Sequence, residues 1–159
     1  MDQNLIGSHG GSLNFENASL ATSTVTANHV NVANKVNYVI DGKFYHATVS
    51  NDLALSAGHT ALVNNQACVF ALWANNTGVY STTQGEIVDS QAVEQGRRTL
   101  PLPDVVDTKA LIGLIKVKAG VATTFTPTST AFNATNVNTT FVNTLSMPSK
   151  PFTDTVTAA

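Results

Sequence analysis

The stretch NYVIDGKFYHATV, residues 37–49, constrains the fold of this chain more than any other segment. Two runs rich in β-branched and aromatic residues flank Asp41-Gly42, the residue pair that a tight type I′ turn prefers. The stretch therefore predicts a β-hairpin over residues 36–49. Because an isolated hairpin is barely stable in water, it must pack against further sheet.

The composition agrees with a protein built mainly from strands. Charged residues make up only 11% of the 159-residue chain, against about a quarter in average domains. Thr and Asn supply about a quarter of the residues, and Thr favours strands, whereas the helix-favouring Lys and Glu are scarce. The hydrophobic fraction of 43% can support the core of one domain. We therefore expect an all-β protein.

Two apolar runs, ACVFALWA (67–74) and ALIGLIKVK (110–118), have the length of buried strands. The first is expected to be a central strand that is covered on both faces or lies at an interface, with Phe70 and Trp73 on opposite faces. Further strands are predicted within 50–66, 79–89 and 120–132, while 136–148 is either a last strand or a loop. Gly85 is expected to mark a bulge or a turn. Residues 90–109 contain Pro101 and Pro103, which predicts a loop with one short helical turn at most.

These segments predict a β-sandwich or jelly-roll-like body over residues 36–148, with roughly seven to nine short strands. Residues 149–159 form a C-terminal tail in this scheme. Residues 1–35 are rich in Asn, Ser, Thr, Gly and Ala, and they predict an extended N-terminal arm that is either a flexible tail or becomes ordered on a partner surface. The predicted core of the body consists of Val39, Phe44, Val69, Ala71, Ile112, Leu114 and Phe125.

Few residues suggest chemistry, and none does so in a specific pattern. The histidines have no second ligand type at a metal-site spacing, so we predict no metal site and no cofactor. The segment GSHGG (7–11) faintly resembles an oxyanion loop, but no nucleophile elbow accompanies it. Carboxylates and the one basic doublet are more simply explained as solvated loop residues. The residues considered were His9, His29, His46, His59, Cys68, Glu86, Asp89, Arg97, Arg98, Asp104 and Asp107.

Charge and cysteine content narrow the class of partner. A net charge of −2 does not indicate binding to nucleic acid or to an anionic membrane. No apolar run has membrane-spanning length, and the N-terminus lacks the features of a secretory signal, so synthesis in a cytoplasm is expected. The single cysteine excludes an internal disulfide. The absence of a catalytic pattern favours a structural or binding protein over an enzyme.

The order of elements resembles the decoration, or cement, proteins on the capsids of tailed bacteriophages. The resemblance is carried by NYVIDGKFYHA (37–47), VFALWANNTGVYSTTQGEIV (69–88), LPLPDVVDTKALIGLIKV (100–117) and ATTFTPTSTAF (122–132). It implies a non-enzymatic virion protein on the capsid exterior, made in the host cytoplasm, that bridges neighbouring major capsid subunits. It also implies a homotrimer at local three-fold positions. The runs 67–74 and 110–118 contain more apolar residues than the core of one small sandwich needs, which independently favours a homo-oligomer.

Two other functions stay open on the sequence. One is a phage fibre, spike or baseplate component that binds a host surface or a glycan. The absence of aromatic residues from the main loop, 90–109, counts mildly against it. The other is a small hydrolase, for which the sequence offers no placed nucleophile or base.

Overall fold

The computed structural model describes residues 12–144, which form eleven strands and one short helix. The predicted all-β class is therefore confirmed. The elements are β1 (Leu13–Asn14), β2 (Leu20–Thr22), β3 (Val30–Val32), β4 (Val36–Ile40), β5 (Lys43–Ala47), β6 (Ser50–Leu53), β7 (Gln66–Ala74), β8 (Tyr80–Gln84), β9 (Val88–Asp89), α2 (Ser90–Glu94), β10 (Ala110–Ala119) and β11 (Val137–Asn143).

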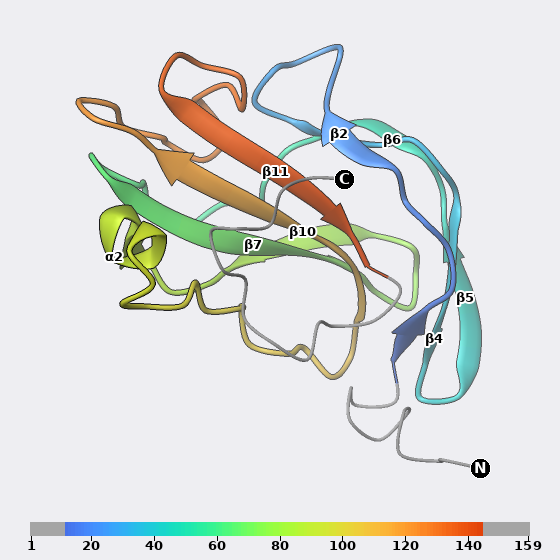
Figure 1. The fold of residues 1–159 in the computed structure, drawn as a ribbon. Helices are drawn as coiled ribbons and strands as arrows, with labels where there is room; N and C mark the ends of the chain where they lie inside the picture. Colours follow the sequence, from blue (N-terminus) through green and yellow to red (C-terminus); the bar gives the residue numbers. More distant parts are fainter. Residues whose placement is uncertain (1–11, 145–159) are drawn as a thin grey trace.

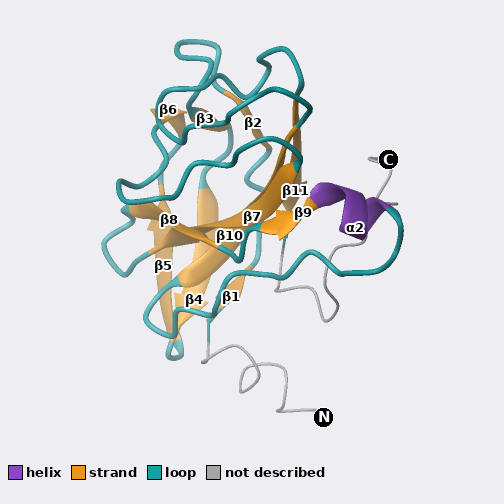
Figure 2. Cartoon of the chain, turned by 90° about the vertical axis from the view of Figure 1, so that its left-hand side faces the viewer, coloured by secondary structure: helices purple, strands orange, loops and turns teal. Residues whose placement is uncertain are grey.

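The strands form three antiparallel sheets (Figure 1). The central sheet has the order β11-β10-β7-β8, and β9 continues beside β7. The hairpin sheet has the order β1-β4-β5, and the small sheet has the order β2-β3-β6. Figure 2 shows α2 on one side of the central sheet and β4–β5 on the other, which gives a sandwich-like body. Among the described residues, no helix combines the length and the apolar character needed to cross a membrane.

The central strands β7 and β10 are buried along nearly their whole length and separate two hydrophobic clusters. Phe70 belongs to the cluster shared with the hairpin sheet and the small sheet. Trp73 belongs to the cluster shared with α2 and the following loop, and its Nε1 donates a 2.8 Å hydrogen bond to Thr83 Oγ1. The prediction of opposite faces is confirmed. Both rings are buried within the single chain, however, so neither is left for an interface.

The predicted hairpin is confirmed as β4 and β5, with Asp41 (φ 50°) and Gly42 (φ 76°) in the left-handed conformation of a type I′ turn. Six predicted core residues are buried, but the assignment of Phe44 to the core was wrong, since its side chain is 78% exposed. Phe44 pairs with Val39 on the outer face of the hairpin sheet, whereas Tyr38 and Tyr45 pair on the inner face. Both faces carry apolar side chains, so alternation alone could not identify the inner one.

The predicted N-terminal arm was wrong for the part of it that the structure describes, residues 12–34. These residues supply β1, β2 and β3, which pair with β4 and β6 of the same chain. Leu20, Val30 and Val32 are buried in the core. Each strand is short, but fully buried side chains together with backbone pairing offset the entropy of ordering it. The start of the predicted arm (1–11) and the predicted tail (149–159) lie outside the described residues.

Several connecting segments complete the comparison with the sequence. Residues 137–143 form β11, which decides between the strand and the loop alternatives for that region. The predicted strand over 120–132 was wrong: only Phe125 makes a β-bridge, to Leu62, and turns with positive φ at Ala122 and Thr128 surround it. The helical turn expected in 90–109 is α2, capped by Asp89, whose carboxylate accepts hydrogen bonds from the backbone N–H groups of Gln91 and Ala92.

Candidate interaction surface

The outer face of the hairpin sheet exposes two stacked aromatic rings. Phe15 follows β1, and its backbone N–H donates a 3.0 Å hydrogen bond to Asn37 O. Its ring lies 5.9 Å from the ring of Phe44, with 22° between the ring planes. Phe15 is 46% exposed and Phe44 78% exposed. Leu13 and Val39 pair on the same face, and we call these four residues the aromatic patch.

Polar contacts hold Phe15 in place from both sides. Asn14 is buried, and its Nδ2 donates hydrogen bonds to Glu16 O (2.9 Å) and Thr144 O (3.0 Å). Glu16 accepts hydrogen bonds from Asn37 Nδ2 (2.8 Å) and Asn37 N (3.2 Å). The side chains before and after Phe15 are therefore tied to β4 and to the residue that follows β11. A partner that covers the aromatic patch would meet a surface that needs little ordering.

The aromatic patch is suited to adhesion. Fully burying a Phe side chain contributes about 1.5–3 kcal/mol, and most of that gain is still available at Phe44 because its ring is largely exposed. Sequence reasoning found the hairpin but placed Phe44 in the core, so it missed this surface. Phe15 carried no signal beyond its aromatic side chain, because a two-residue strand leaves no period to read.

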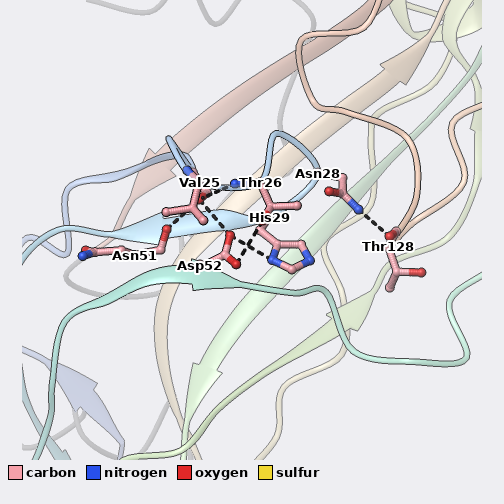
Figure 3. A network of polar contacts seen from close by, with 8 residues as sticks. Val25, Thr26, Asn28, His29, Asn51, Asp52 and Thr128 are labelled. Carbon is pink, nitrogen blue, oxygen red and sulfur yellow. Dashed lines mark hydrogen bonds and ion pairs between the residues drawn. The ribbon is translucent and has the colours of Figure 1, made fainter.

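A separate polar cluster brings His29 and Asp52 together (Figure 3), and Ser23 contacts the same carboxylate. His29 Nδ1 lies 3.0 Å from Asp52 Oδ1, a separation at which a protonated ring forms an ion pair with the carboxylate. Ser23 Oγ lies 2.6 Å from Asn51 O and 2.9 Å from Asp52 Oδ1, and it accepts a hydrogen bond from Val25 N. The serine thus contacts the carboxylate and the backbone. In a Ser-His-Asp triad, by contrast, the serine contacts the histidine.

This cluster fastens the 23–29 turn to β6. Partial burial of Asp52 raises its pKa, but hydrogen bonds from Thr26 and Ser23 and the nearby His29 outweigh that effect, so the pKa lies below the usual value. Next to it, Asn28 Nδ2 donates a hydrogen bond to Thr128 O, which ties the same turn to the β10–β11 loop. The cluster therefore stabilises one end of the sandwich.

Two of the remaining histidines and the single cysteine lie within the described residues. His46 is exposed on β5. His59 Nε2 lies 2.8 Å from Thr82 Oγ1 and its ring packs on Phe70, and burial lowers the His59 pKa. Cys68 is buried in β7, and burial raises its pKa to about 12. His9 and the segment 7–11 lie outside the described residues. Within residues 12–144, no group of three or more His, Cys, Asp or Glu side chains could hold a metal ion.

The charged side chains considered in the sequence analysis have separate structural roles or are exposed to solvent. Glu86 forms an ion pair with Arg98, and Asp89 caps α2. Arg97, Asp104 and Asp107 are exposed, as expected for solvated loop residues.

Comparison with known proteins gave no relatives: no family model, no curated protein and no solved structure matches this chain.

Proposed function

We propose that this protein is a non-enzymatic virion structural protein that decorates a bacteriophage capsid and stabilises it by bridging neighbouring major capsid subunits. The aromatic patch is the observation that carries the proposal, because it offers a rigid apolar contact surface on a body with few charges. Three of the four stretches behind the resemblance correspond to the hairpin, to β7–β8 and to the loop that leads into β10. The fourth, 122–132, folds into turns instead of the expected strand.

Each protomer would contribute a modest contact at the aromatic patch. Several such contacts in one oligomer combine through effective concentration, so that the assembly holds several capsid subunits at once. Because the patch is apolar, the attachment should depend little on salt. A homotrimer at local three-fold positions remains part of the proposal on the resemblance alone, since the apolar surplus of β7 and β10 is already buried within one protomer.

Co-sedimentation with shells assembled from the major capsid protein of the same genome tests the attachment. The wild-type protein should move with the shells, and Phe44→Ser should weaken binding about tenfold or more, because about 1.4 kcal/mol lost per contact is a factor of ten. Val25→Ser is the matched control, since Val25 is also largely exposed but lies in the 23–29 turn. Failure of the wild-type protein to bind, or equal binding by all three proteins, would contradict the proposal.

Sedimentation equilibrium at micromolar concentration tests the oligomer separately. The trimer predicts three times the 16.7 kDa chain mass. A monomer at every concentration, without contact between copies on the particle, would rule out the trimer but not the decoration role.

A further inference from the structure

Three turns converge on an open pocket of about 260 Å³ at the tip of the β4–β5 hairpin. The hairpin contributes an apolar, an acidic, a basic and an aromatic side chain, while the β7–β8 turn and the turn before β10 contribute one polar side chain each. The lining residues are Ile40, Asp41, Lys43, Tyr45, Asn76 and Thr108.

Five of the six side chains that line the pocket are polar. Among residues 12–144, none of the five polar side chains makes a hydrogen bond or an ion pair. A carboxylate, an ammonium group, an amide and two hydroxyl groups are thus available to a ligand at one place. Polar side chains that gather in a concave site and remain available are a common feature of binding sites.

The residues next to the lining are, in contrast, firmly held. Tyr38 OH donates a 2.6 Å hydrogen bond to Asn75 O, directly before Asn76. Asn75 Oδ1 accepts hydrogen bonds from Thr77 N and Val79 N, both 2.9 Å long. Lys109 Nζ, directly after Thr108, donates to Ser81 Oγ at 2.8 Å. The chain on either side of Asn76 and next to Thr108 is therefore held before a ligand arrives, which lowers the entropic cost of binding.

We propose that this pocket binds a single pyranose ring of a neutral sugar. The charges of Asp41 and Lys43 cancel, so the site favours a neutral ligand with several hydroxyl groups, which a carboxylate, an ammonium group and an amide can bind from different sides. Tyr45 supplies an aromatic wall, and its ring is supported from behind by Tyr38, 6.2 Å away between centroids. The volume lies below the roughly 300–1,000 Å³ of sites for drug-sized ligands, which suits one ring and not a longer chain.

Titration of the ¹⁵N-labelled full chain, followed by amide chemical shifts, tests the proposal. The probes are the methyl glycosides of glucose, galactose and mannose, with the acyclic polyol sorbitol and the zwitterion glycine as comparisons. At least one glycoside should give saturable shifts at 40–45, 75–78 and 107–109 with a Kd on the order of millimolar. The proposal is overturned if no glycoside saturates at these residues by about 100 mM, or if sorbitol or glycine binds there as well as the best glycoside does.

Two substitutions assign the binding to this pocket. Asp41→Asn removes the carboxylate yet keeps the turn, because Asn adopts positive φ readily. Asn76→Ala removes an exposed amide. Each should weaken glycoside binding at least fivefold without changing the urea midpoint, while Asp104→Asn, an exposed carboxylate in the 90–109 loop, should bind as the wild type does. Wild-type binding by both pocket variants would overturn the proposal, and neither result depends on capsid attachment.

Discussion

Replacing Leu20 with alanine should lower the free energy of unfolding by about 3 kcal/mol. Leu20 lies in β2, is 7% exposed and belongs to the cluster that faces the central sheet. The substitution removes three buried carbon atoms, which at about 0.8 kcal/mol each accounts for about 2.4 kcal/mol. The remainder comes from the cavity: the side chain packs against Gly113 of β10, which has no side chain of its own to fill the space.

Urea unfolding at one fixed protein concentration measures this loss, because an oligomer's stability varies with concentration. Val25→Ala is the control, since it lies in the same N-terminal segment but is 71% exposed, and it should change stability by less than about 0.5 kcal/mol. A loss below about 0.5 kcal/mol for Leu20→Ala would refute the reasoning, because residues 12–34 would then behave as an arm and not as part of the core.

Three further predictions concern single side chains. Ile112→Ala should cost about 2–5 kcal/mol in the same unfolding assay, because Ile112 is fully buried; a change within experimental error would be inconsistent with its position in β10. The folded-state pKa of Asp52 lies below the unfolded value of about 3.8, so its contribution to stability is complete above that pH and is lost as the pH falls through the folded pKa. Asp52→Asn should flatten the acid side of the pH–stability curve, and an unchanged curve would show that the contacts of Asp52 with Ser23, Thr26 and His29 do not stabilise the fold. Burial raises the Cys68 pKa to about 12, so a thiol reagent at pH 8 should react only after unfolding; rapid reaction of the folded protein would show that β7 is accessible.

The features predicted correctly depend on signals that are local in the sequence. Asp41-Gly42 determines a turn almost by itself, and β7 and β10 are long enough for their apolar character to stand out. The features that were missed depend on distant pairing. The strands β1 and β2 are two and three residues long, and only their partners in β4 and β3 show that they are strands. The aromatic patch depends on which face of the hairpin turns inward, which is decided by the central sheet and not by the hairpin itself.

The position of Trp73 makes the protein a reporter of its own unfolding. The chain has one tryptophan, and its indole is buried in the cluster beside α2, with its N–H bonded to Thr83. Its fluorescence emission should therefore be blue-shifted in the folded state and shift to longer wavelength when that cluster opens. The strands β2 and β3 lie across the central sheet from this ring, so they can separate without exposing it. Coinciding fluorescence and circular dichroism transitions would show that the two sides of the sheet unfold as one cooperative unit, and a lag between them would reveal an intermediate that has lost only one side.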